Sequence, residues 1–594
     1  MKADQIRINR WGATLLALCA TVFSAGMAFA GPQKISGDLQ AKTTANAEMV
    51  DVIVRFTTVP TAAHHEKILS RGGTIKRELG QFKGAAYSMP ASALADLADD
   101  PDVVYISPDR PLKGASEGKP NAVNDYHIGV INAPAAWAMG LNGSGIGVAV
   151  IDSGIASLPD ITAKNIVYSQ DFTGLGSAAD QYGHGTHVTG ILAGNGAMST
   201  GSGYSYTFKG IAGGVSIVNL RVLDENGAGS DSEVIAALQE AITLKSQYNI
   251  RVINLSLGRP VWESYALDPL CQAVEDAWNA GIVVVVAAGN YGRDNAADTN
   301  GYGTITAPGN DPVVITVGAM NTEGSKERTN AVIASYSSKG PTIIDSVVKP
   351  DLVAPGNLID SLYFPAATIN KQNPGFEIPQ SLYVINGPVK PSATYYALSG
   401  TSMAAPMVSG AAALMLQQVP TLTPDQVKAR LMKTAFKGLV QSSTAADLIT
   451  GQTYIDQADI FTVGAGYLDI QAALANTDLA PSTTGSAMSP SATIDSNGTV
   501  TLAANGSSVL GGTSILWGTS ILWGTSILWG TDSPVEGSSI LWGTSTELAA
   551  SSILWGTGSA TNDSILWGSS SSTDIDAASA LWGTTTPGII NDQK

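Results

Sequence analysis

The sequence is poor in cysteine and in charge, above all positive charge, and each scarcity excludes a class of protein. Its 594 residues include two cysteines, which excludes a disulfide-stapled fold and a four-cysteine zinc site. Lysine and arginine number 32 against 49 acidic residues, a net charge of −17. This excludes nucleic acid as the main partner, because binding phosphates requires a basic surface. Hydrophobic residues make up 44% and charged residues 14%, so the chain can bury a large core.

Residues 1–30 have the pattern of a secretory signal peptide. Lys2, Arg7 and Arg10 supply a positive start, an apolar run follows, and Ala-Phe-Ala at 28–30 is a small-x-small cleavage signal. A membrane anchor is the alternative, but the apolar run is short for spanning a bilayer. We therefore expect a secreted, extracellular protein.

Strand and helix patterns divide the rest of the chain into three parts. Residues 48–115 predict a β-α-β-β-α-β order, the ferredoxin-like α+β arrangement. In 120–475, continuous Val/Ile runs alternate with helical segments, which predicts an α/β domain: a parallel sheet with helices on both faces. Residues 476–594 are rich in Ser, Gly and Thr and form a low-complexity tail.

Three glycine-flanked motifs carry candidate chemistry. A buried strand ends at Asp152, a His-Gly-Thr-His sequence opens a helix at His184, and Gly-Thr-Ser-Met with Ser402 precedes an apolar helix. Taken singly, Asp152 could be a turn residue and Ser402 a helix cap. His184 and His187 could be a metal pair, because positions i and i+3 share a helix face.

Together, the order Asp, His, Ser is the order of the subtilisin triad. The chain resembles the subtilisin-like serine proteases (subtilases) over about residues 128–475. Further segments similar to the family lie at 256–258, 287–290, 351–356 and 464–469.

The resemblance implies a role for each residue of the motifs. Ser402 would be the nucleophile, His184 the general base and then acid, and Asp152 the group that orients the imidazole. Asn290 would donate a hydrogen bond to the oxyanion. His187 is expected to be structural. No cofactor is expected for catalysis, and protein or peptide substrates are expected.

Substrate-binding residues are also implied by the resemblance. Gly227, Ala228 and Gly229 would form an edge strand that pairs with the substrate backbone. Ser256, Leu257 and Gly258 would form one wall of the pocket for the residue before the cut. Thr306 would lie near the bottom of that pocket. Residues 192–209 do not match the calcium loop of subtilisins, so a structural calcium stays open and its ligands unknown. Residues 364–392 look like an insertion.

The 48–115 region resembles the subtilase inhibitor-type prodomain, which implies a folding helper and an intramolecular inhibitor. The precursor is then expected to cut itself between Leu112 and Ala122.

The tail repeats one pentapeptide. Ser-Ile-Leu-Trp-Gly occurs at 514–518, 520–524, 526–530, 539–543, 552–556 and 564–568, with a weaker copy at 580–583. The repeats suggest short strands and turns, stacked in an array. Attachment to the cell surface, self-association and a merely sticky tail are all open.

We interpret the chain as a secreted, self-processed serine endopeptidase that acts through an acyl-enzyme. A catalytically dead subtilase scaffold that serves as a surface protein is the alternative. The intact set of Asp152, His184, Ser402 and Asn290 argues against it.

Overall fold

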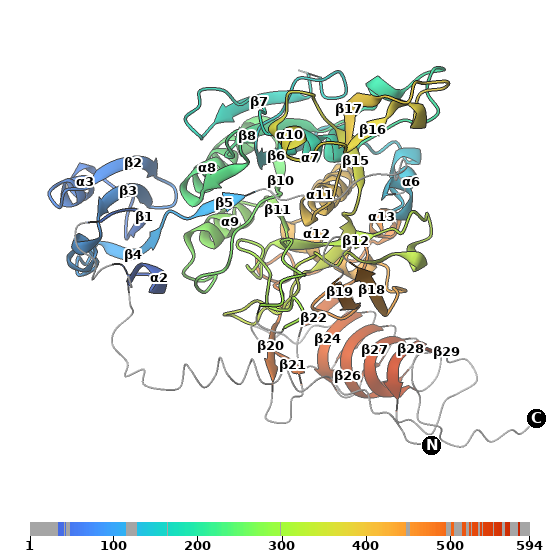
Figure 1. Ribbon diagram of the computed structural model, residues 1–594. Helices are drawn as coiled ribbons and strands as arrows, with labels where there is room; N and C mark the ends of the chain where they lie inside the picture. Colours follow the sequence, from blue (N-terminus) through green and yellow to red (C-terminus); the bar gives the residue numbers. More distant parts are fainter. Residues whose placement is uncertain are drawn as a thin grey trace, which may run out of the picture.

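The structure is a computed structural model, and it describes an N-terminal domain, a central domain and the strands of the repeat region (Figure 1). The described residues are 34–40, 42, 48–113, 127–162, 164–296, 299–446, 452–494, 500–503 and the strands between 514 and 582. The expected signal peptide and most of the expected processing region lie outside them. Among the described helices, none is both long enough and apolar enough to cross a membrane.

The central domain is built on an eight-stranded sheet in the order β13-β12-β11-β10-β6-β8-β7, with β14 also paired to β12. All these strands pair in parallel except β13, so the α/β prediction is confirmed. Their bounds are β6 Gly147–Asp152, β7 Ile166–Asp171, β8 Ser216–Arg221, β10 Ile250–Leu255, β11 Val283–Ala287, β12 Ile315–Asn321, β13 Val332–Ile333 and β14 Leu352–Pro355.

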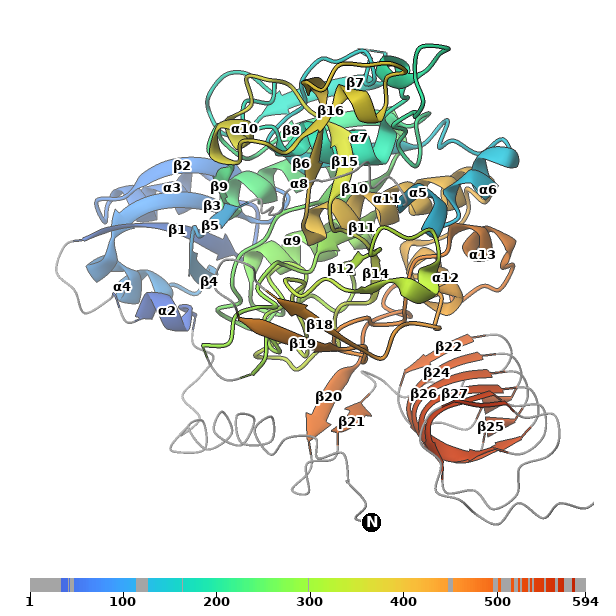
Figure 2. The ribbon, with the colours of Figure 1, turned by 45° about the vertical axis from the view of Figure 1, so that its right-hand side comes forward.

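Helices cover both faces of this sheet. On one side α7 (His184–Ala193) packs against α11 (Thr401–Gln418); on the other, α8 (Asp231–Tyr248) packs against α9 (Pro269–Asn279), as Figure 2 shows. Every residue of β6 and β11 is buried, which is why these strands read as unbroken apolar runs. Other helices of this domain are α5 His127–Val130, α6 Ala133–Ala138, α12 Pro424–Thr434 and α13 Ile470–Ala475.

The N-terminal domain has the predicted element order. Its antiparallel sheet runs β2-β3-β1-β4. The elements are β1 Met49–Phe56, α3 Ala62–Leu69, β2 Thr74–Leu79, β3 Gly84–Pro90, α4 Leu94–Ala98 and β4 Val103–Pro108. Val52, Val54 and Phe56 belong to this domain's own core, whereas Ile53, on the other sheet face, belongs to the core of the central domain. Both faces of the sheet therefore contribute residues to a core.

Both domains extend past the predicted boundaries. Upstream of residue 48, Ile35 bridges Ile106, and Leu39 of α2 (Gly37–Gln40) is buried in the N-terminal domain. Downstream of 475, Ser489 donates to the buried carboxylate of Asp351. No periodic sequence pattern indicates either extension, because each contact is made by single polar or apolar residues in short or irregular segments.

The inserted segment forms a small sheet in the order β15-β17-β16, with α10 beside it (Figure 1). The bounds are β15 Ile359–Leu362, α10 Thr368–Gln372, β16 Glu377–Pro379 and β17 Pro391–Leu398. The backbone of Ile369 donates to the carbonyl of Tyr182, and a Cβ on Gly183 would meet Ile369 at 2.8 Å. The insertion thus packs against the turn that immediately precedes His184.

Candidate active site

Asp152 and His184 meet where the last residue of β6 faces the first turn of α7. The Nδ1 atom of His184 lies 2.8 Å from Oδ1 and 3.0 Å from Oδ2 of Asp152, and both side chains are fully buried. Gly185 permits this approach, because a Cβ there would lie 2.3 Å from the carbonyl oxygen of Gly154. The two motifs that the sequence singled out therefore form one buried pair.

The electrostatics of this pair favour a protonated imidazole. Burial by itself lowers the pKa of His184, but the adjacent Asp152 carboxylate outweighs burial, so the pKa is raised above its ordinary value. His187, one turn along, contacts the carbonyl of Tyr396 through Nε2 at 3.0 Å, and burial lowers its pKa to about 3. A neutral, buried His187 fits the structural role predicted for it.

Sequence reasoning missed Asp180, which anchors the start of α7. Its carboxylate accepts hydrogen bonds from the backbone amides of Gly183 and Thr186 and from the hydroxyls of Ser153 and Thr186, at 2.6–2.9 Å. Burial raises the pKa of this carboxyl, although the four hydrogen bonds oppose that shift. An acidic residue four positions before His184 was the available signal, since a carboxylate suits a helix N-terminus.

Ser402 is the second residue of α11, and it forms two hydrogen bonds with Ser256. The Oγ of Ser402 donates to the carbonyl of Ser256 at 3.0 Å, and the Oγ of Ser256 donates to the carbonyl of Ser402 at 2.8 Å. Asn254 donates from Nδ2 to the Ser256 hydroxyl and accepts from the Ser409 hydroxyl.

Nε2 of His184 is buried and has no hydrogen-bond partner in the described part of the chain. The Ser402 hydroxyl thus rests on Ser256 rather than on the imidazole. Catalytic hydrogen bonds of this kind often tighten only when substrate binds.

Asn290 follows β11 and is oriented by the first residue of α11. Its Oδ1 accepts from the backbone amide of Thr401 at 2.9 Å and from the Thr401 hydroxyl at 3.0 Å. Both hydrogen bonds to the Asn290 amide oxygen come from Thr401, so the Nδ2 donor of Asn290 points away from Thr401. The start of α11 holds Asn290 and Ser402 in one place.

Three of the predicted substrate-binding residues, Ala228, Gly229 and Gly258, pair with another segment of the same chain. The chain leaving the N-terminal domain forms β5 (Pro111–Lys113), which pairs antiparallel with β9 (Ala228–Ser230). In this register Leu112 lies opposite Gly229, and Lys113 also bridges Gly258. Leu112 is 1% exposed and belongs to the central domain's core.

Thr306 lies between the predicted pocket wall at 256–258 and the segment that leads to Asn290. A Cβ on Gly258 would meet its Oγ1 at 2.6 Å, and a Cβ on Gly289 would meet its Cγ2 at 2.7 Å. Thr306 is buried, and its hydroxyl donates to the carbonyl of Ala288 at 3.2 Å.

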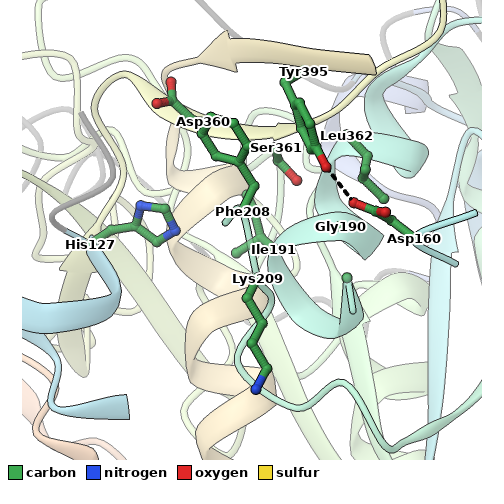
Figure 3. A pocket seen from close by; sticks show the side chains of 11 residues that line it. His127, Asp160, Gly190, Ile191, Phe208, Lys209, Asp360, Ser361, Leu362 and Tyr395 are labelled. Atoms are coloured by element: carbon green, nitrogen blue, oxygen red, sulfur yellow. Dashed lines mark hydrogen bonds between the residues drawn. The ribbon is translucent and has the colours of Figure 1, made fainter. Parts of the chain in front are cut away.

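A small cavity lies beside α7, away from the Asp152 pair, and Asp160, Lys209 and Tyr395 are among its lining residues (Figure 3). Residues 192–209, which do not match a calcium loop, supply hydrogen bonds to Asp160 instead: the Met198 backbone amide donates to its carboxylate. Within the described residues no three or more His, Cys, Asp or Glu side chains gather in a way that could hold a metal ion.

Comparison with known proteins identifies the family. A family model described as the Subtilase family matches residues 143–466. Serine protease AprX of Bacillus subtilis (strain 168) is 37% identical over 297 residues, which are 48% of this chain and 60% of the relative. Subtilisin E of the same organism is 32% identical over 422 residues, 70% of this chain and 87% of the relative. The chain therefore belongs to the subtilase family and is a serine endopeptidase of the subtilisin type, as the sequence motifs predicted.

A solved structure supports the fold. The chain is similar to fervidolysin from Fervidobacterium pennivorans, described as a keratinolytic enzyme related to subtilisin, with a TM-score of 0.53 and 22% identity. The match covers 74% of this chain and 62% of fervidolysin.

Proposed function

We propose that this chain is the precursor of a secreted endopeptidase that cuts its own N-terminal domain from the central domain and then cuts other proteins. The observation that supports this proposal is β5, which pairs with β9 and also bridges Gly258, as an extended peptide substrate would when it adds a strand. Secretion is proposed from the signal peptide pattern at 1–30, outside the described residues.

The chemistry proposed for the site is acyl transfer. Nε2 of His184 takes the proton of Ser402 as Oγ bonds to the carbonyl carbon, and Asp152 stabilises the imidazolium that results. The oxyanion receives hydrogen bonds from Asn290 Nδ2 and from the Ser402 backbone amide. The carbon–nitrogen bond then breaks, and His184 returns its proton to the leaving amine. Water then bonds to the acyl carbon as His184 takes its proton, the bond from that carbon to Ser402 Oγ breaks, and His184 returns the proton to Oγ.

The register of β5 suggests which bond is cut first. Lys113 is opposite Gly258, and in an antiparallel pair each step forward on one strand is a step back on the other. Counting on, residue 115 would come opposite Ser256, whose carbonyl accepts the Ser402 hydroxyl. We therefore propose Ala115–Ser116 as the first bond cut. Both residues lie outside the described part of the chain, and the proposal rests on register alone.

Inhibition by the N-terminal domain is proposed from its polar contacts with the central domain. Arg110 donates to buried Glu263 at 2.6 Å, and Tyr105 donates to the same carboxylate. Asp109 accepts from the backbone amide of Ser232 at 2.9 Å, in the first turn of α8, where a carboxylate is favourable. These contacts would hold β5 against β9 and Gly258 after the cut.

The test compares the wild-type chain with Ser402→Ala, both expressed in a protease-deficient host. We expect wild-type product with Ser116 at its N-terminus by Edman sequencing and intact mass, and an uncut Ser402→Ala precursor. A fluorophosphonate probe should label wild type only. If Ser402→Ala also acquires a new N-terminus between Leu112 and Ala122, another protease makes the cut. If the probe does not label the wild-type protein, the result favours the alternative of a catalytically inactive subtilase scaffold.

A further inference from the structure

The pentapeptide repeats stack as one parallel sheet, in register. Figure 2 shows the strands as successive turns of a coil. The sheet order is β22-β24-β26-β27-β28-β29, and the tryptophan of each strand lies opposite that of the next. The bounds are β22 Ser514–Trp517, β24 Ser526–Asp532, β26 Ser539–Ala549, β27 Ser552–Ala560, β28 Ile565–Ser570 and β29 Ala580–Trp582.

Charge is confined to one part of each turn. Between 514 and 582 the sequence has six acidic residues and no basic one, and all six follow a Ser-Ile-Leu-Trp-Gly unit rather than fall within it. The first turn, 514–525, consists of two such units with their threonines and carries no charge. Its edge therefore presents no charge that would repel another acidic molecule.

The stack has two ends, and both are strand edges. Within the described residues, β22 pairs with β24 alone and β23 (Leu522–Trp523) pairs with β25 (Val535–Glu536) alone at one end, and β29 pairs with β28 alone at the other. An edge strand presents unpaired backbone N–H and C=O groups that can receive a further strand. β22 has the same four residues, Ser-Ile-Leu-Trp, that begin β24, so it suits the same kind of neighbour that it has within the chain.

We propose that copies of this chain associate head to tail, with β22 of one copy pairing in parallel and in register with β29 of another. Every pairing along this stack is parallel, the tryptophans of successive strands lie opposite each other, and the proposed contact continues this pattern between molecules. Because the two edges differ, the contact is heterologous and does not close on itself, so it produces open chains of molecules. This association does not depend on catalysis, and it would gather many protease domains in one assembly.

The experiment uses the full-length chain in the Ser402→Ala background, so that self-cleavage does not change the population. Sedimentation velocity is measured over a range of protein concentrations. We expect the average mass to rise with concentration beyond that of a dimer. A chain ending at residue 503 should remain monomeric.

Two edge variants test the direction of the contact. Leu516→Pro blocks β22 and Leu581→Pro blocks β29, because proline cannot donate to a strand ladder. Each variant alone should be monomeric, since every molecule then lacks the same edge. An equimolar mixture should form dimers, twice the monomer mass and no larger, because one compatible pair of edges remains. Thr585→Pro, beyond β29, is the matched control and should assemble like the parent.

Three results would overturn the proposal: a parent that stays monomeric at every concentration, assemblies that both edge variants leave intact, or a mixture that fails to form dimers. Closed dimers that persist in both edge variants would point to association through the faces of the stack.

Discussion

Tyr395 donates its phenolic hydrogen to the carboxylate of Asp160 at 2.7 Å, and its oxygen also lies 2.9 Å from the hydroxyl of Ser199 (Figure 3). Tyr395 belongs to the strand that leads to Ser402, Asp160 to the loop after Asp152, and Ser199 to the loop after α7. One buried hydrogen-bonded cluster therefore connects the three segments that carry the proposed triad.

Replacing Tyr395 by phenylalanine should destabilise the central domain by about 1–3 kcal/mol, because a buried carboxylate loses a donor. Burial raises the pKa of Asp160, and the Tyr395 hydrogen bond opposes that shift. A raised folded pKa contributes stability at low pH that is lost as pH rises through it. The variant raises this pKa further, so its deficit should be smallest in acid and grow toward neutral pH. Thermal unfolding at several pH values measures this.

The control for this substitution is Tyr383→Phe. The Tyr383 hydroxyl lies 2.9 Å from the neutral hydroxyl of Ser392, so no charged group loses a partner. A deficit at or below about 1 kcal/mol without pH dependence is expected. Equal and pH-independent losses in both variants would show that Asp160 is not the group concerned.

The pH dependence of hydrolysis should report the raised pKa of His184. A general base must be neutral, so kcat/KM should rise with pH through a midpoint above the ordinary histidine value of about 6.5. Asp152→Asn removes the charge that raises this pKa and leaves burial, which lowers it. The midpoint should therefore move to lower pH while kcat falls by about 10⁴-fold, the loss known for the same change in the trypsin triad. An unmoved midpoint in the Asn variant would assign the titration to another group.

Asn290→Ala should lower kcat by about 10²–10³-fold with little change in KM, because its amide is proposed to act on charge that develops in the transition state. This magnitude is the one known for the oxyanion-hole asparagine of subtilisin itself. Thr401→Ala, which removes one of the two hydrogen bonds to Asn290 Oδ1, should cost less. Steady-state kinetics on a peptide substrate distinguishes them. A tenfold rise in KM with unchanged kcat would contradict the oxyanion role.

Removing the tail should preserve peptide hydrolysis only if the cut leaves Ser489 in place. Ser489 donates to Asp351 at 2.5 Å and accepts from Lys428 at 3.0 Å, and Lys428 is so deeply buried that its pKa falls to about 7. A chain ending at 494 should match the full chain in peptide kcat/KM. A chain ending at 478 should be less stable, because buried charges lose a partner.

Ser489→Ala in the chain ending at 494 isolates the contacts of the Ser489 hydroxyl. This variant should lose roughly 1–3 kcal/mol of stability. Thermal unfolding of the three proteins provides the comparison. Full stability of the chain ending at 478 would show that residues 479–494 only lie against the domain.

The sequence by itself determined the family, the central α/β sheet and the order of the elements in the N-terminal domain. These features are encoded locally. A buried strand ending at Asp152, a helix opening at His184 and a helix opening at Ser402 are each recognisable within a few residues, and apolar periodicity identifies strands and helices in the same way. The sequence also identified the repeats, but it left their arrangement open among several possibilities.

Only the tertiary structure decided the features that depend on contacts between residues far apart in the sequence. The contacts of Tyr395 with Asp160 and of Ser489 with Asp351 join positions 235 and 138 residues apart. Hydrogen bonds from single polar side chains have no period, so no sequence pattern indicates them. The register of the tail strands likewise depends on backbone pairing between successive turns. Identical pentapeptides could pair in several registers, and the fold of the coil selected one.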